Sequence, residues 1–300
     1  MIFLAYTDKY VLDLPEGHKF PMIKYELIYE QLLYEGIFEP KNFFEPTLVS
    51  EEIILKTHDP YYWHRLKNLQ LTPLEFRRIG FPPSEKMVFR CRSSAGATLQ
   101  CAYYALENGA SLNIAGGTHH AYADRGEGFS MLNDIAIAIN ELRSRKIIQR
   151  ALIVDLDVHQ GNGTAKIFEN IPEVFTFSMH GKDNYPLRKE KSDLDIALPT
   201  GTQDKEYLSI LAQTLPVLIA QQDPEIIFYQ AGVDILSTDK IGKLSITQEG
   251  CKQRDEIVFS TAKKHNLPIV AVMGGGYSTQ IKDIVNAHVN TFKVAQKYYD

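Results

Sequence analysis

Short runs of consecutive apolar residues recur along the chain and limit the folds open to it. Longer segments with a helical pattern separate these runs. Apolar residues at consecutive positions indicate strands that are buried on both faces, as in a parallel sheet covered by helices. Strand followed by helix, repeated, predicts an α/β fold. The runs occupy residues 111–115, 151–157, 174–179, 225–231 and 268–273.

The segments between the runs predict helices and give no sign of a domain boundary. At 300 residues the chain is near the upper limit for one hydrophobic core. There is no repeat or low-complexity tract, and we interpret residues 78–86, which contain two prolines, as a surface loop. We therefore predict one domain over residues 1–300. The expected helices are 94–108, ending before Gly109; 204–222, capped by Asp204; and 247–265, beginning at Thr247.

Composition and charge exclude several classes of protein. No apolar stretch approaches the roughly 20 residues that span a bilayer, and the N-terminus lacks a secretory pattern. A net charge of -5 without a Lys/Arg cluster argues against direct nucleic-acid binding. The cysteines, Cys91, Cys101 and Cys251, show no CxxC spacing, so we expect neither a disulfide framework nor a thiolate zinc site. A reducing, cytoplasmic compartment fits best.

Polar, glycine-containing motifs follow four of the five apolar runs. They read GGTHHA, VHQGNG, GVD and GGGY. Ligands of parallel α/β sheets bind at the carboxyl ends of the strands, and glycine lets the backbone approach a ligand closely. Each motif also holds a residue that can bind a metal ion or move a proton. We therefore expect the four motifs to form one site.

The segment DLDVH indicates a metal ion. Asp155, Asp157 and His159 alternate with apolar residues, so their side chains leave the same face while the chain stays extended. Buried carboxylates are costly unless they are paired or bind a cation, and a divalent metal is the simplest counter-charge. Taken alone, the same residues could merely cap neighbouring loops.

The other three motifs are weak individually and stronger together. His119 and His120 could be core histidines, Asp234 could cap a turn, and Tyr277 could be an ordinary packed tyrosine. In combination, Asp157, His159 and Asp234 would leave a metal position open for water, as in a catalytic site. Such a metal lowers the pKa of water and polarises a carbonyl. A histidine could then take up the proton and return it to a leaving amine, while Tyr277 donates a hydrogen bond worth ~3 kcal/mol to the oxyanion.

These motifs, in this order and at comparable intervals, resemble the histone deacetylase superfamily over most of the chain. The match is most similar to the class IV branch, through HQGNG, AGVDILSTDKIGKLSIT and QRDEIVF. The resemblance implies a predominantly parallel sheet of about eight strands flanked by helices, as in the arginase/deacetylase fold. It also implies a metal-dependent amidohydrolase with zinc, or ferrous iron, on Asp157, His159 and Asp234. The catalytic residues would be His119, His120 and Tyr277.

The resemblance also assigns residues around the catalytic group. Asp155 would orient His119, and Asn162 would orient His120. A structural potassium ion would be bound by Asp155, Asp157, His159, Ser178 and Met179. The channel for the acylated side chain would be lined by Gly128, Phe129 and Gly275.

Two positions depart from patterns within the superfamily. Asn162 stands where most members have an aspartate, and a neutral amide stabilises the His120 cation less, so we expect a lower His120 pKa than in an aspartate-paired relative. Ile241 stands where polyamine deacetylases have a glutamate, which leaves a cationic polyamine without a counter-charge. We therefore favour an acyl-lysine protein or peptide, acetylated or carrying a longer fatty acyl group, over a small acylated amine such as a polyamine.

Two further functions remain as alternatives. A manganese ureohydrolase shares the architecture, but it needs a two-metal cluster, and AGVDILSTD lacks a closely spaced D-x-D. A catalytically silent binder of acyl-lysine would have no need of the proton-transfer groups. Metal counting and an activity assay separate these alternatives from the deacylase.

Overall fold

Eight strands form one sheet in the computed structural model, which describes residues 1–300. The strand order is β2-β1-β3-β8-β7-β4-β5-β6, and every pairing is parallel. The predicted α/β class with a parallel sheet is therefore confirmed. The strands are β1 (Phe3–Ala5), β2 (Phe43–Phe44), β3 (Ala110–Asn113), β4 (Ala151–Asp155), β5 (Val174–Gly181), β6 (Leu194–Leu198), β7 (Ile226–Gln230) and β8 (Ile269–Val272).

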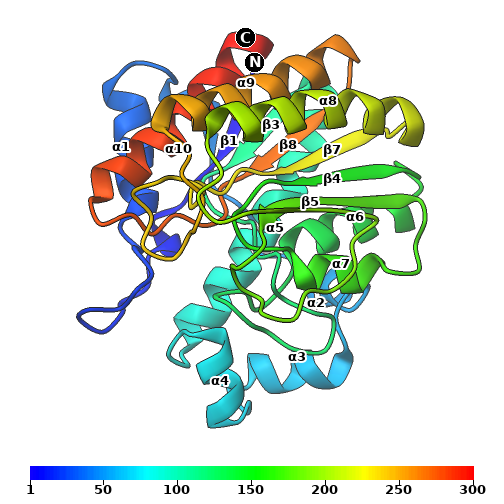
Figure 1. The fold of residues 1–300 in the computed structure, drawn as a ribbon. Coiled ribbons are helices and arrows are strands. Elements are labelled where there is room, and N and C mark those ends of the chain that lie inside the picture. Colours follow the sequence, from blue (N-terminus) through cyan, green and yellow to red (C-terminus); the bar gives the residue numbers. More distant parts are fainter.

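Helices cover both faces of the sheet. They are α1 (Lys24–Tyr34), α2 (Glu51–Ile54), α3 (Pro60–Lys67), α4 (Pro73–Ile79), α5 (Glu85–Asn108), α6 (Asp134–Ser144), α7 (Asn162–Phe168), α8 (Asp204–Gln222), α9 (Gln248–Lys264) and α10 (Ile281–Tyr299), with 3-10 turns η1 (Asp8–Tyr10) and η2 (Pro40–Asn42). Helices α8, α9 and α10 lie on one face, and α5, α6 and α7 lie on the other (Figure 1). None of the helices has the length and hydropathy needed to cross a membrane.

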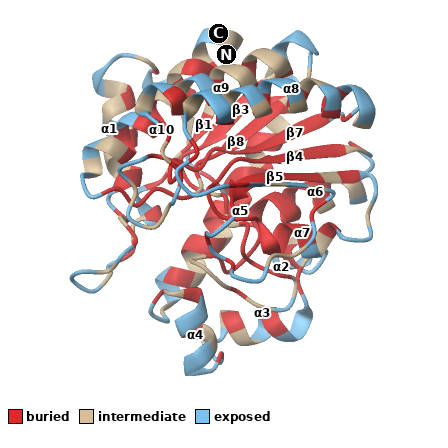
Figure 2. Ribbon diagram, viewed as in Figure 1, coloured by how far each residue is buried: buried red, intermediate tan, exposed pale blue.

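The central strands are buried along their whole length, which explains their uninterrupted apolar sequences. Every residue of β3, β4, β7 and β8 is buried, and Figure 2 shows these strands buried between helices whose outer faces are exposed. All five predicted runs coincide with strands. Strands β1, β2 and β6 were not predicted, because β1 and β2 are too short to show a pattern and β6 is a partly exposed edge strand.

Two helix starts differ from their predictions. Helix α5 begins at Glu85, not at residue 94, and Ser84 Oγ caps it by accepting the backbone N–H of Met87. The predicted loop 78–86 is therefore wrong at both ends, since α4 continues to Ile79. Asp204 is not the cap of α8 but its first residue, and its carboxylate instead accepts hydrogen bonds from the backbone and hydroxyl of Thr247. The start predicted at Thr247 is confirmed to within one residue, since Thr247 caps α9 and Gln248 is its first residue.

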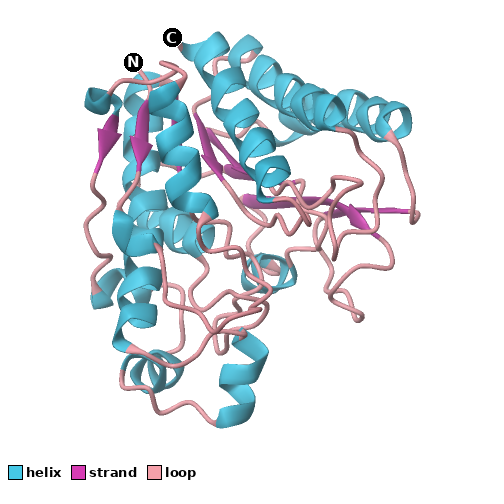
Figure 3. Ribbon diagram, turned by 90° about the vertical axis from the view of Figure 1, so that its left-hand side faces the viewer, coloured by secondary structure: helices cyan, strands magenta, loops and turns pink.

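The strand order brings the four polar motifs together. They leave the carboxyl ends of β3, β8, β7 and β4, which are consecutive neighbours in the middle of the sheet. Figure 3 shows long loops gathered below the strands. The two chain ends meet elsewhere, where Ile2 donates its backbone N–H to Asp300 Oδ1 at 3.1 Å.

Candidate active site

Asp157, His159 and Asp234 form a compact group of potential metal ligands. Asp157 and His159 follow β4, and Asp234 follows its neighbour β7. One ligand atom from each residue lies within 4.8 Å of the others, and all three side chains are buried. His159 Nδ1 lies 3.0 Å from Asp157 Oδ1 and 3.1 Å from Asp234 Oδ2. The structure thus brings together the three residues predicted to bind the metal.

The chemistry of this group fits a divalent cation. Asp234 Oδ2 is buried and accepts no well-directed hydrogen bond within the protein. Burial, together with the nearby Asp157 carboxylate, raises the pKa of Asp234 to about 7, so this second carboxyl group resists ionisation without a cation. Gly275 leaves the space open, because a Cβ there would lie 3.0 Å from Asp157 Oδ2 and closer still to Asp234 Oδ2. Two carboxylates and one imidazole suit zinc or ferrous iron.

Asp155 faces the histidine pair, not the ligand group. Strand β4 ends at this residue, so the extended geometry expected through His159 does not continue. Asp155 Oδ2 accepts a hydrogen bond from His119 Nδ1 at 2.7 Å, and its Oδ1 accepts the backbone N–H of Asp157 at 3.2 Å. The side chain therefore supports His119 and the start of the ligand loop together.

The two adjacent histidines have opposite electrostatic surroundings. Their ring centroids are 4.1 Å apart. Although burial opposes it, the carboxylates of Asp155 and Asp157 raise the pKa of His119. Burial lowers the pKa of His120 well below its ordinary value, with a further contribution from His119. His119 is thus suited to carry a positive charge, while His120 is suited to be a neutral base.

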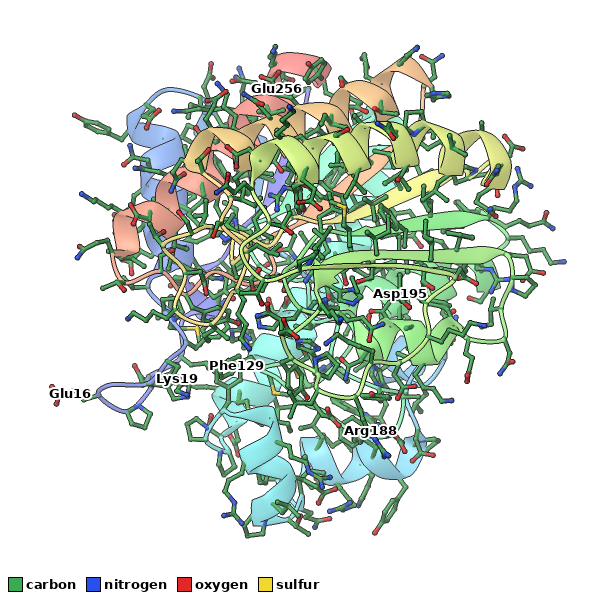
Figure 4. All side chains as sticks on the ribbon, in the orientation of Figure 1. Glu16, Lys19, Phe129, Arg188, Asp195 and Glu256 are labelled. Carbon is green, nitrogen blue, oxygen red and sulfur yellow. The ribbon has the colours of Figure 1, made fainter.

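Tyr277 and Phe129 complete the walls of the site. The Tyr277 ring lies 6.5 Å from that of His159 and 6.0 Å from that of Phe129. Burial, and then the Asp234 carboxylate, raise the pKa of Tyr277 well above 10, so its hydroxyl keeps a proton to donate. Phe129 has a positive φ of 64° and donates its backbone N–H to Ile79 at 2.7 Å. Figure 4 shows Phe129 near the base of the N-terminal loop that carries Lys19 and Glu16.

One pocket collects most of the predicted site residues. Its lining includes His119, His120, Gly128, Phe129, Asp157, His159, Gly275 and Tyr277. Asp155 and Asp234 contact this lining through His119 and His159, as described above, and Asn162 Oδ1 lies 2.6 Å from His120 Nδ1. Among the residues predicted to bind potassium, Asp155 and Ser178 are register partners on β4 and β5, with Met179 next along the strand. Ser178 Oγ is hydrogen-bonded to His180 Nδ1 at 2.9 Å.

Several residues of the site were missed in the sequence. Phe20, Tyr25 and Arg90 line the pocket from the N-terminal third of the chain. The Tyr185 ring stands perpendicular to that of His120, with centroids 4.9 Å apart. Because Tyr185 lies in a loop without a motif, no local pattern indicated it. Arg90 shares its helix with Lys86 and Arg92, so nothing in the sequence distinguished it from a surface cation.

Asp239 is a further missed residue, and it holds the loop that carries Tyr277. Its Oδ2 accepts the Tyr277 backbone N–H at 2.6 Å, and its Oδ1 accepts those of Ile241 and Gly242 at 2.8 Å. An aspartate shortly before a glycine is a common turn pattern. That pattern could have predicted a turn at Asp239, but it does not indicate that Asp239 binds the backbone of Tyr277.

A parallel sheet with a buried Asp/His/Asp group at its carboxyl end, flanked by two histidines and a tyrosine, defines the class of metal-dependent hydrolases. The Histone deacetylase domain family matches residues 18–292. The chain is 44% identical, over 99% of both sequences, to an uncharacterized protein of Picosynechococcus sp.. It is 32% identical to Histone deacetylase 2 of Arabidopsis thaliana, over 92% of this chain and 74% of that protein.

A solved structure supports the fold independently. The crystal structure of an HDAC homolog from Aquifex aeolicus matches with a TM-score of 0.82 and 23% identity, covering 98% of this chain and 84% of that one. The chain belongs to the histone deacetylase superfamily. It therefore has the domain of a metal-dependent deacetylase of acyl amides. Placement in the class IV branch stays a prediction.

Proposed function

We propose that this chain is a zinc-dependent deacylase that hydrolyses the amide of N-acyl-lysine, with acetyl or longer fatty acyl groups as substrates. The observation that carries the proposal is the convergence of a metal-fitting triad, a neutral histidine and a protonated tyrosine on one pocket. The Ile241 side chain, which packs against the core, carries no negative charge that could pair with a polyamine. We propose residues 1–300 as the catalytic domain.

The proposed metal ligands are Asp157, His159 and Asp234. When bound, zinc supplies a water molecule of lowered pKa and polarises the substrate carbonyl. Ferrous iron fits the same ligands. Gly275 keeps the ligand group accessible because it has no side chain, while Gly128 and Phe129 form the channel wall opposite Tyr277.

The proton transfers are assigned to residues of this chain. His120, which burial keeps neutral, takes a proton from the attacking water at Nε2 and delivers it to the leaving amine. His119, held by Asp155, places a positive charge beside it. Tyr277 Oη donates a hydrogen bond to the carbonyl oxygen as negative charge develops there.

A structural potassium ion is also proposed, on Asp155, Asp157, His159, Ser178 and Met179. Its support is the register pairing of Asp155 with Ser178. Melting temperatures in potassium and in sodium at equal ionic strength test it: a higher value in potassium is expected, and equal values would count against the ion.

The function is tested with acyl-lysine peptides of increasing chain length and with acetylated polyamines, using zinc-loaded and iron-loaded protein. We expect hydrolysis of acyl-lysine and much weaker hydrolysis of the polyamine. His120→Ala and Tyr277→Phe are the controls. Full activity in both variants would exclude this mechanism, and binding without turnover in the unaltered protein would support a silent binder.

A further inference from the structure

A row of hydrogen bonds runs from His120 away from the pocket and ends at a carboxylate. His120 Nδ1 lies 2.6 Å from Asn162 Oδ1. Asn162 Nδ2 donates to Tyr122 Oη at 3.0 Å, and Tyr122 Oη donates to Glu190 Oε1 at 3.1 Å. Glu190 lies in the loop that Figure 4 marks at Arg188, before Asp195 of β6. The row thus joins motifs after β3 and β4 to the loop that leads into β6.

The carboxylate at the end gives this row a direction. An ionised carboxylate only accepts, so Glu190 requires Tyr122 to donate its single proton outward. The Tyr122 oxygen can then only accept from Asn162, which must turn its Nδ2 toward it. The Asn162 oxygen therefore faces His120, and the proton of a neutral His120 must lie on Nδ1. His120 Nε2 is left unprotonated and faces the pocket as a base.

We propose that Tyr122 and Glu190 are positioning residues that, through Asn162, set the tautomer of His120. The inference rests on the proposed function only for its kinetic consequence. An aspartate at position 162 would accept from His120 in either orientation. An asparagine can rotate and present its donor instead, so it needs a partner that fixes its orientation.

The row is held firmly at its outer part. Tyr122 is buried, and the Arg125 guanidinium lies 3.5 Å from its ring centroid. Burial, followed by the charge of Glu190, raises the pKa of Tyr122 to about 12, which keeps its hydroxyl protonated. Gln160 accepts the backbone N–H of Glu190 at 2.9 Å and donates to its carbonyl at 2.7 Å. The Glu190 carboxylate is therefore presented by a fixed backbone.

The tautomer can be measured directly by NMR. Protein labelled with 15N in histidine, zinc-loaded and at one fixed pH, gives two-bond correlations that report which ring nitrogen carries the proton. His120→Ala assigns the resonance. We expect only the Nδ1–H tautomer in the unaltered protein and a mixture in both Tyr122→Phe and Glu190→Gln. Asp183→Asn is the matched control, because it removes a charge from the same loop while its carboxylate contacts Thr200, outside the row.

A rescue experiment separates positioning from a general structural defect. Adding Asn162→Asp to Tyr122→Phe should restore the single Nδ1–H tautomer, because a carboxylate needs no partner to remain an acceptor. In the single variants kcat should fall about 3- to 10-fold with little change in KM, as for the loss of one hydrogen bond. A single Nδ1–H tautomer in both Tyr122→Phe and Glu190→Gln would overturn the proposal. The NMR result does not depend on turnover, so an inactive unaltered protein would defeat the proposed function alone.

Discussion

At the scale of single residues, burial and the nearest partner decide whether each histidine is charged. His119 has a carboxylate partner and a raised pKa, whereas His120 has an amide partner and a lowered one. His58 is a third case, away from the pocket. It donates from Nδ1 to the Ala123 carbonyl at 3.2 Å and accepts the backbone N–H of Asn133 at Nε2 at 3.0 Å. Acceptance at Nε2 requires the neutral ring, since a protonated imidazole can only donate.

Because His58 is buried and neutral, we expect the folded protein to lose stability in acid. Burial lowers its pKa to about 4, so between about pH 6.5 and 4 the unfolded chain binds more protons than the folded one. Its contribution to stability is therefore complete above that window and is lost as the pH falls. His58→Gln should reduce the loss of unfolding free energy between pH 7 and 5 by about 2 kcal/mol. Denaturant titrations at the two pH values measure this, and equal losses in both proteins would contradict it.

Tyr277→Phe removes one hydroxyl and leaves the ring contacts with Phe129 and His159 in place. If the hydroxyl stabilises the oxyanion, kcat should fall about 100- to 1000-fold, as for other losses of one oxyanion donor. Zinc affinity and melting temperature should stay unchanged. Steady-state kinetics beside a zinc titration check both, and a variant that loses zinc would instead show a structural role.

At the scale of elements, loops at the ends of β4, β7 and β8 pack so closely that side-chain volume matters. Gly275 donates its backbone N–H to Asp157 Oδ2 at 2.8 Å, while Arg254 of α9 donates to the Gly232 carbonyl just before Asp234. Each ligand carboxylate is thus held by a backbone that a helix or a neighbouring loop supports. Supporting contacts of this kind orient the side chains that bind a metal ion.

Gly275→Ala tests this packing. The added methyl group would press on Asp157 and Asp234, so we expect zinc affinity to fall about 10- to 100-fold, as when a supporting contact is removed. Gly36→Ala is the comparison, because a Cβ there meets nothing within 4 Å and its effect is confined to the backbone. Competition with a chelating indicator gives both affinities. Unchanged zinc binding by Gly275→Ala would contradict this prediction and would show that the loop moves to make room for the methyl group.

At the scale of the whole molecule, the metal should link separate parts of the sheet. Its ligands come from two strands that are distant in sequence, so binding favours the folded state alone. Free zinc at 100 times its dissociation constant should stabilise the protein by about 2.7 kcal/mol. Calorimetry with and without a chelator measures the shift. One bound equivalent is expected, and two equivalents of manganese would favour the ureohydrolase alternative.

The residues nearest each other in sequence were the most predictable part of the site. Asp157 and His159 lie two positions apart after a buried strand, and His119 and His120 are adjacent. Local apolar patterns identify such strands, and covalent spacing keeps their polar ends together. The five buried strands and the four polar motifs could therefore be predicted from the sequence alone.

Tertiary structure alone decided which strands are neighbours. The placement of β7 beside β4 brings Asp234 within 3.1 Å of His159, and the loop before β6 brings Glu190 to Tyr122. Nothing near these residues in sequence encodes their partners. Strand order arises from packing summed over the whole core, and loop positions follow from that order. The chemistry of each motif was thus local, whereas the connections between motifs belong to the fold.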